Sequence, residues 1–388
     1  MKKYDVIIVG GGAAGLACGV RLAENSKLRI LILDAGERAG KKLASTGNGQ
    51  GNVSNSDMSI EHYRSGNLAL VEKLCARDGL DIFEPALFVT DERGRVYPSG
   101  KQASALVDCL LRKISASGVE LKLSAKVTDI SYTDRGFEIA VGSEVFSSEY
   151  AVIATGGKAQ KQFKTDGSSY KLAENLGHRI TPLYPSLVQL KTDTTFTKTL
   201  KGIRTDAKVK AIIGGKTVKE VQGDVIFTDY GVSGNAIFYV SPVFSDKCGR
   251  IEIDLLPDFD SARITEILMK RYADGYPTGE ILSGLVHNQI GRAVIKRAAT
   301  EDVRKILSTL KNFTLKVTGT LGFDYAQVTS GGVDMKDVSD NLESKLVKKL
   351  YFAGEVLDVD GDCGGYNLHW AFASAKAVAE AIADANRV

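Results

Sequence analysis

The stretch YDVIIVGGGAAGLACGVRLAENSKLRILILD, residues 4–34, decides the fold of this chain. It opens with a continuous apolar, β-branched run over residues 4–9, which is typical of a strand buried on both faces of a parallel sheet. A Gly-x-Gly-x-x-Gly turn follows at once, residues 16–25 have apolar side chains at helical spacing, and residues 28–33 form a second apolar run. Because an acid, Asp34, closes this run, the order of elements predicts a dinucleotide-binding βαβ unit.

The turn between strand and helix has the residues that a pyrophosphate requires. Gly10 permits the tight turn, Gly12 lets the pyrophosphate approach the backbone, and Gly15 lets the helix pack closely on the strand. Ala13 and Ala14 belong to the turn that leads into the helix, where free N–H groups and the helix dipole would hold the phosphates. We therefore expect the phosphates at this helix start.

The acid after the second strand completes the pattern. Asp34, with Ala35 beside it, is placed to accept hydrogen bonds from ribose hydroxyls, which favours an adenosine without a 2′-phosphate. A fortuitous glycine-rich turn is the alternative. The agreement of strand, helix and acid favours the nucleotide site.

Composition sets limits on the class of protein. The chain has 388 residues, enough for two or three domains, and its hydrophobic and charged fractions of 44% and 25% are ordinary for a soluble protein. Lys and Arg number 50 against 47 Asp and Glu, a balance without a nucleic-acid footprint or a polybasic membrane anchor. The amino-terminal apolar run is too short for a signal segment or a membrane span. Five scattered cysteines without a CxxC pair argue against a disulfide framework or a structural metal site. We predict a soluble, cytoplasmic protein.

A polar, glycine-rich segment over residues 40–55 is long for a connector. Such segments in compact domains are usually functional, although a mobile surface loop has the same composition. The segment AGKKLASTGNGQGNVSN, residues 39–55, resembles the loop of the BaiN/YhiN-like flavoproteins, the group that also contains aminoacetone oxidase. The family usually has Arg-Cys where this chain has Gln50-Gly51, which puts any role of that pair in doubt.

Three further blocks carry the same resemblance. AVIATGG, residues 151–157, is similar to the second flavoprotein signature, and residues 223–242 resemble a further family segment. YFAGEVLDVDGDCGGYNLHW, residues 351–370, is nearly identical to the family's carboxy-terminal signature. The resemblance implies an α/β fold with a Rossmann-like FAD-binding domain of the glutathione-reductase type, and bound FAD.

It also implies which residues contact the FAD. They come from the glycine turn, the polar loop, the adenine-clamp position, and the second and last signatures: Gly10, Gly12, Ala13, Ala14, Gly15, Asp34, Ala35, Lys42, Thr46, Gly47, Asn48, Gly49, Asn52, Val127, Thr155, Gly156, Gly157, Gly354, Glu355, Asp358, Gly364, Gly365, Tyr366 and Asn367. Glu355 and Asp358 are candidate ribityl and phosphate-side contacts, or else solvated loop carboxylates. A glycine pair precedes the last helical pattern, so that helix start would direct its dipole at the ligand.

The middle of the chain has a different pattern. Residues 186–256 contain short β-type segments, among them KTVKEVQG, VIFTD and IFYVSP, with glycines such as Gly223 as turn signals between them. Helical patterns occupy residues 260–310, and KNFTLKVTGT is a further strand. We expect a discontinuous FAD-binding domain, residues 1–185 and 325–388, and an inserted β-rich and helical domain, residues 186–324, that covers the flavin and completes a substrate pocket.

A flavin carries the hydride chemistry, so the protein must position the substrate and supply a proton donor or acceptor. Tyr366 and His369 are closest in sequence to the predicted flavin site and are the catalytic candidates. A capping or packing role for His369 and a backbone role for Tyr366 are equally compatible with the sequence.

The resemblance implies an FAD-dependent oxidoreductase that reduces an activated, enone-type C=C bond of a steroid- or bile-acid-like substrate. NADH or NADPH would bind transiently, since no second complete Gly-x-Gly-x-x-Gly unit is present. One alternative is an amine oxidase that converts a small α-aminoketone such as aminoacetone with O2 to give H2O2. Another class comprises flavin-dependent RNA modification or a flavin-binding protein without turnover. We expect a small-molecule substrate, no nucleic acid and no membrane as partners; the sequence leaves the oligomeric state open.

Overall fold

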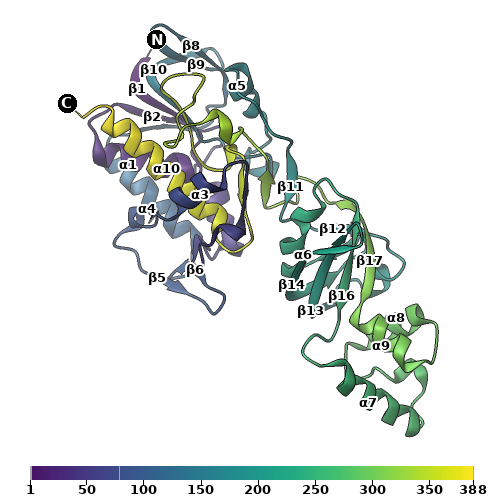
Figure 1. Ribbon diagram of the computed structural model, residues 1–388. Coiled ribbons are helices and arrows are strands. Elements are labelled where there is room, and N and C mark those ends of the chain that lie inside the picture. Colours follow the sequence, from purple (N-terminus) through teal and green to yellow (C-terminus); the bar gives the residue numbers. More distant parts are fainter. Residues whose placement is uncertain (1, 78, 388) are drawn as a thin grey trace. The chain divides into compact units, whose positions relative to one another are not determined.

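The computed structural model describes residues 2–77 and 79–387 (Figure 1). The chain divides into two compact units. Residues up to Tyr184 and from Val328 onward form the first unit, and Pro185–Gln327 form the second. The predicted fold class is confirmed: a Rossmann-like α/β unit is interrupted by a β-rich insertion.

The first unit is built on a seven-stranded sheet in the order β7-β2-β1-β10-β9-β8, with β19 paired to β10. β1, β2, β7, β10 and β19 run parallel where they pair, whereas β8 and β9 are antiparallel. The bounds are β1 (Lys2–Val9), β2 (Ile30–Leu33), β7 (Glu120–Lys122), β8 (Val127–Thr133), β9 (Gly136–Val141), β10 (Glu144–Ile153) and β19 (Leu350–Phe352). The apolar runs of the sequence therefore form the centre of a parallel sheet.

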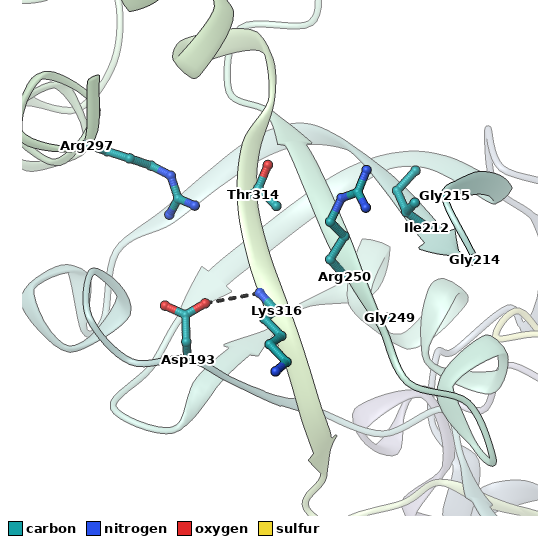
Figure 2. A pocket seen from close by; sticks show the side chains of 9 residues that line it. All are labelled: Asp193, Ile212, Gly214, Gly215, Gly249, Arg250, Arg297, Thr314 and Lys316. Carbon is teal, nitrogen blue, oxygen red and sulfur yellow. Dashed lines mark hydrogen bonds between the residues drawn. The ribbon is translucent and has the colours of Figure 1, made fainter. Parts of the chain in front are cut away.

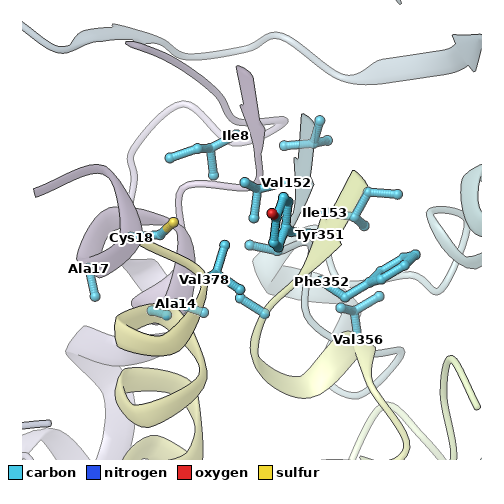
Figure 3. Close-up of a cluster of buried hydrophobic side chains, with 14 of the residues drawn as sticks. Ile8, Ala14, Ala17, Cys18, Val152, Ile153, Tyr351, Phe352, Val356 and Val378 are labelled. Atoms are coloured by element: carbon cyan, nitrogen blue, oxygen red, sulfur yellow. The ribbon is translucent and has the colours of Figure 1, made fainter. Parts of the chain in front are cut away.

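Helices cover this sheet because the strands are apolar on both faces. α1 (Ala13–Asn25) packs between α10 (Tyr366–Asp384) and α4 (Ala103–Ala116). Figure 3 shows Cys18 of α1 and Val378 of α10 close to Ile8 and Val152 of the sheet, and these four side chains are fully buried. The long carboxy-terminal helix is thus held by the amino-terminal βαβ unit.

Shorter helices and strands make up much of the rest of the first unit, with β11 at its boundary along the chain with the second. They are α2 (Lys41–Ser45), α3 (Leu68–Cys75) and α5 (Tyr170–Asn175), the pair β4 (Tyr63–Ser65) and β20 (Val359–Gly361), the sheet of β3 (Ser54–Asn55), β5 (Phe88–Thr90) and β6 (Arg95–Pro98), and the pair β11 (Tyr184–Ser186) and β18 (Val328–Ser330). In the described part of the chain, no helix is long and apolar enough to cross a bilayer.

The second unit is a closed barrel in the order β12-β15-β14-β13-β16-β17. Its strands are β12 (Leu190–Thr192), β13 (Arg204–Ile213), β14 (Lys216–Phe227), β15 (Gly231–Ser233), β16 (Gly249–Asp254) and β17 (Phe313–Thr320). The helices are α6 (Asn235–Val240), α7 (Ser261–Ala273), α8 (Asn288–Ala298) and α9 (Val303–Lys311). A separate apolar core fills this unit.

Two expectations for the barrel are wrong. Residues 237–242, expected as a β-type segment, lie in α6 and the turn after it, and β14 runs through Gly223 without interruption. A Cβ on Gly223 would lie 3.5 Å from the backbone nitrogen of Ala236, an ordinary van der Waals distance, so Gly223 is a strand residue that faces α6 and does not mark a turn. Tertiary packing, which the local sequence does not report, decides both positions.

Candidate functional site

The glycine turn after β1 has the backbone geometry that the predicted phosphate cradle requires. Gly10 has a φ of 113°, and a Cβ there would lie 2.7 Å from the carbonyl carbon of Ala154, just beyond β10. A Cβ on Gly15 would lie 2.9 Å from the carbonyl carbon of Gly10, so both positions require glycine. α1 begins at Ala13, and its N-cap residue Gly12 offers no side chain to the N–H groups of the first turn. Such a helix start is suited to bind phosphate.

Asp34 is fixed at the end of β2 by the main chain. Its Oδ2 accepts the N–H of Gly11 at 2.6 Å, and its Oδ1 accepts the N–H of Gly36 at 2.7 Å, across Ala35. A carboxylate has about four lone-pair sites, so each oxygen can accept a further bond. The structure thus places an oriented acceptor beside the cradle, as a ribose contact requires.

Three predicted cofactor contacts from distant segments meet in this unit. The Nζ of Lys42, on α2, donates to Oε2 of Glu355 at 2.8 Å. A Cβ on Gly157 would lie 2.7 Å from Oε1 of the same carboxylate. That oxygen also accepts the N–H of Thr329 at 2.9 Å. The polar loop, the second signature and the carboxy-terminal signature therefore converge on Glu355.

The polar loop is ordered by its backbone. Thr46–Gly49 form a 3-10 turn in which Gly47 and Asn48 have left-handed φ values of 56° and 55°. Gly51 has a φ of 83°, and a Cβ there would lie 3.1 Å from the Cα of Ala103. Glycine therefore suits the place where the resembling family has cysteine, while Gln50 is exposed.

Asn52 holds this loop in place. Its Nδ2 donates to the carbonyl oxygens of Ser54 at 3.1 Å and Val96 at 3.2 Å, and the side chain is buried. The amide nitrogen is thus engaged within the loop, and a cofactor contact of Asn52 stays a prediction.

The carboxy-terminal signature packs on the amino-terminal half of the site. A Cβ on Gly354 would lie 2.8 Å from the Cβ of Ala14, in the first turn of α1. Gly365 is the N-cap of α10, with a φ of 103°, and a Cβ there would lie 2.5 Å from the carbonyl carbon of Ser54. Asn55 donates from Nδ2 to the carbonyl of Gly364 at 3.0 Å. The carboxy-terminal signature therefore packs on the first turn of α1 and on β3.

Asn367 closes the turn before α10. Its Oδ1 accepts the N–H of Gly361 at 2.8 Å, and its Nδ2 donates to the carbonyl of the same residue at 2.9 Å. This side chain shapes the glycine turn, and a direct contact with cofactor stays a prediction.

The two catalytic candidates, His369 and Tyr366, are buried. The Nδ1 of His369 lies 2.8 Å from Oγ of Ser54, and its Nε2 lies 2.8 Å from the carbonyl oxygen of Cys75. Because a carbonyl oxygen only accepts, Nε2 carries the proton in the neutral ring and Nδ1 accepts from Ser54. The ring of Tyr366 stacks on His62 with centroids 4.4 Å apart. Both candidates are held by packing, and their catalytic roles stay predictions.

The second signature leaves one polar atom without a partner. β10 ends at Ile153, and Oγ1 of Thr155 is buried and accepts or donates no hydrogen bond within residues 2–77 and 79–387. Gly156 follows with a left-handed φ of 71°. Val127, at the adenine-clamp position, opens β8 and is buried. Its role stays a prediction.

A group of acids surrounds Asp358. Burial, together with the charges of Asp360 and Asp334, raises the pKa of Asp358 to about 6. The hydroxyl of Tyr170 is buried and has no partner in the described part of the chain. Burial and the charges of Glu355 and Asp358 raise the pKa of Tyr170, so its phenol stays protonated. Perturbed groups of this kind are typical of functional sites.

Sequence reasoning missed several residues of this site. Ser54 and His62 contact the two catalytic candidates, and Thr329 binds Glu355. Oγ1 of Thr329 also accepts the N–H of Lys158 at 2.7 Å. Thr329 follows the inserted unit along the chain, so no local signal connects it to the site. Within residues 2–77 and 79–387, no three His, Cys, Asp or Glu side chains are grouped so that they could hold a metal ion.

The residues present fit a bound FAD. A Cβ on Gly12 would meet no heavy atom within 4 Å, so the approach to the first turn of α1 is open. The orphaned hydroxyl of Thr155 and the uncapped N–H groups of α1 are polar groups that need a partner. A dinucleotide bound at the glycine turn would supply hydrogen-bond partners to both.

Replacing Thr155 by valine tests this fit. The apoprotein should be as stable as the parent or more stable by up to about 1 kcal/mol, because an unsatisfied buried hydroxyl is removed. The affinity for FAD should fall about tenfold, the loss expected for one hydrogen bond. Urea unfolding of the apoprotein and titration with FAD measure the two effects.

The matched control is Thr165→Val, because Oγ1 of Thr165 donates to the carbonyl of Ala159 at 2.6 Å. This control should lose about 1 kcal/mol of stability. A Thr155→Val apoprotein that is destabilised as much as the control would contradict the assignment.

Comparison with known proteins agrees with this geometry. The family described as HI0933-like protein Rossmann domain matches residues 4–381. A 3-dehydro-bile acid delta(4,6)-reductase of Clostridium scindens is 31% identical, over 97% of this chain and 98% of that protein. A ribosomal RNA dihydrouridine synthase of Escherichia coli is 29% identical, over 98% of each chain.

Among solved structures, 3-ketosteroid delta1-dehydrogenase from Sterolibacterium denitrificans aligns with a TM-score of 0.55 over the whole of both chains. The identity is only 10%, so this likeness concerns the fold alone.

Proposed function

This chain belongs to the HI0933-like family of FAD-dependent oxidoreductases, and we propose that it reduces a carbon–carbon double bond conjugated to a carbonyl group, with NADH or NADPH as electron donor. The observation that carries the proposal is the pair of relatives aligned over nearly their full length, a bile-acid reductase and an rRNA dihydrouridine synthase.

The two activities have one chemical step in common. A 3-oxo group activates the Δ4 bond of a 3-dehydro bile acid, and the C4 carbonyl activates the C5=C6 bond of uridine. In both cases a hydride adds to the carbon remote from the carbonyl and a proton adds to the adjacent carbon, while the donor loses two electrons. An enzyme for either substrate needs the same reducing site and differs in how it binds the rest of the molecule.

The residues of the first unit support the cofactor half of this proposal. The first turn of α1 would bind the pyrophosphate, and Asp34 would accept the ribose hydroxyls. The ion pair between Lys42 and Glu355 fixes the polar loop against the carboxy-terminal signature. FAD, when bound, would supply the two-electron carrier.

The proton must come from the protein or from water. His369 and Tyr366 are the predicted candidates for this role, yet both ring nitrogens of His369 are engaged with Ser54 and Cys75. A positioning role for His369 therefore agrees better with the geometry: it holds the segment at Ser54 against α10.

Two substrate classes are compatible with the proposal. The near-neutral net charge argues against RNA, but two aligned relatives are named rRNA dihydrouridine synthases, so an RNA substrate remains in the test beside a 3-oxo-4-ene steroid. No observation favours the amine oxidase or a flavin-binding protein without turnover.

The test uses purified FAD-loaded protein under anaerobic conditions. We expect NADH or NADPH to bleach the flavin absorbance, and either a 3-oxo-4-ene bile acid or unmodified rRNA fragments to restore it, with a product two hydrogens heavier by mass spectrometry. Consumption of oxygen with release of peroxide from aminoacetone, and no reduction of either alkene, would contradict the proposal.

A further inference from the structure

The second unit contains a cavity of about 360 Å³ on the outer side of its barrel. Figure 2 shows side chains from β16, β17 and α8 around it, together with the turn between β13 and β14. The lining residues are Asp193, Ile212, Gly214, Gly215, Gly249, Arg250, Arg297, Thr314 and Lys316. A cavity of this size is in the range of small-molecule sites. Only one of its lining side chains, that of Ile212, is a large apolar one.

Two cations of the cavity lie side by side on neighbouring strands. Arg250 on β16 and Lys316 on β17 are direct partners in the antiparallel register. Like charges at directly opposite positions destabilise a sheet, so an anion bound near these two residues would relieve their repulsion. Arg250 also forms an ion pair with Glu252 at 2.9 Å, whereas Lys316 has no ion pair among the described residues.

A third cation comes from a helix. Arg297, on α8, lies over the rings of Phe196 and Phe313, with its guanidinium carbon 5.1 and 5.0 Å from the ring centroids. This stacking fixes the guanidinium without neutralising it. In the described residues Arg297 makes no ion pair, and its side chain lines the cavity.

The single lining carboxylate is engaged by the main chain. The Oδ2 of Asp193 accepts the backbone N–H of Lys316 at 3.1 Å, and the backbone N–H of Asp193 donates to the carbonyl of Lys316 at 3.0 Å. These bonds fix the loop against β17. Three cationic side chains against this one carboxylate leave the lining positive.

We propose that this cavity is a phosphate-binding site, through which the barrel holds a phosphate ester of the substrate or of the electron donor. The proposal deepens the proposed function, because RNA backbone phosphates and the phosphates of NADPH offer the same chemistry. The charge of the inserted unit suits a phosphate from either source. Residues 185–327 contain more Lys and Arg than Asp and Glu, whereas the rest of the chain contains slightly fewer.

The test measures binding by the full-length, FAD-loaded protein. The variant Arg297→Gln/Lys316→Gln removes the two lining cations that form no ion pair within the described part of the chain. The matched control Arg292→Gln/Lys296→Gln removes the same charges from positions of α8 that do not line the cavity. Fluorescence anisotropy with a labelled uridine-containing single-stranded RNA and calorimetry with NADPH and with pyrophosphate give the dissociation constants.

We expect the cavity variant to bind pyrophosphate and RNA at least about tenfold more weakly than the control. The salt slope of RNA binding should fall by about 0.7 for each phosphate that the variant no longer neutralises. Weaker binding of NADPH and pyrophosphate with RNA unchanged supports the phosphate site and identifies the dinucleotide as its source. Equal affinities of both variants for all three probes overturn the proposal.

Two single variants distinguish loss of a phosphate contact from loss of the folded structure. Lys316→Gln alone changes an exposed side chain, so it should weaken pyrophosphate binding while the protein stays folded and keeps its FAD. Arg297→Lys keeps the charge and should restore part of the affinity. None of these readouts requires turnover. An absence of alkene reduction would therefore contradict the proposed function without affecting the evidence for the phosphate site. Equal phosphate binding by both variants would contradict the phosphate site without affecting the proposed function.

Discussion

Replacement of Gly12 by valine should give a folded but colourless protein. Gly12 has a φ of −83°, which any residue adopts, and a Cβ there would meet no heavy atom within 4 Å. The apoprotein should therefore lose no more than about 1 kcal/mol, the cost of an apolar residue at an N-cap. The branched side chain would, however, project into the open space in front of the first turn of α1. A pyrophosphate must occupy that space to reach the N–H groups.

We expect the affinity for FAD to fall at least about a hundredfold, because the phosphates can no longer reach the helix start. The flavin absorbance per chain and the FAD titration of the apoprotein measure this. Gly100→Val is the control: Gly100 is also free of neighbours within 4 Å, is exposed, and lies in the same unit. A Gly12→Val protein that purifies as yellow as the control would place the cofactor elsewhere.

The amino-terminal βαβ unit could be predicted because each of its elements has a local signal. The apolar run of residues 4–9 forms β1, the glycine turn sets the start of α1, and Asp34 ends the second strand. These local signals agree with one another over about thirty residues, and tertiary packing favours the same secondary structure.

The barrel could be predicted only as a class. The sequence indicates short β-type segments there, but residues 237–242, which have β-branched and aromatic side chains, form part of a helix and a turn. Gly234, with a φ of 104°, is the N-cap residue of α6, whereas Gly223 lies within β14 and faces that helix. A glycine inside a strand and a glycine at a turn look alike in one sequence.

Within the candidate site, the sequence indicates which glycines shape the turns, but it does not indicate which side chains contact one another. The ion pair of Lys42 with Glu355 joins residues 313 positions apart, and the contact of Ser54 with His369 joins residues 315 apart. No local pattern reports such pairs. His369 is a catalytic candidate because it is close in sequence to the flavin signature. Its contacts with Ser54 and Cys75 instead show how α10 is fixed.

Replacement of Gly365 by alanine should disrupt the joint between the two ends of the chain. Gly365 has a φ of 103°, and a Cβ there would lie 2.5 Å from the carbonyl carbon and 2.6 Å from the nitrogen of Ser54. Both neighbours are backbone atoms, so no side-chain rotation relieves the overlap. β3 or the start of α10 must move, which would break both the Asn55 bond to Gly364 and the His369 bond to Ser54.

We expect the free energy of unfolding to fall by about 3–5 kcal/mol, the range of severe backbone and packing defects, and the bound FAD to dissociate. Urea unfolding followed by flavin fluorescence measures both. Gly142→Ala provides the comparison, because Gly142 has a left-handed φ of 59° with no atom within 4 Å, so only the conformational cost of about 1 kcal/mol remains. If the free energy of unfolding fell by the same amount in both variants, the backbone of Ser54 would not be in close contact with the start of α10. The polar loop and the carboxy-terminal signature would then not be held together at this point, and the two ends of the chain would need another contact to form one site.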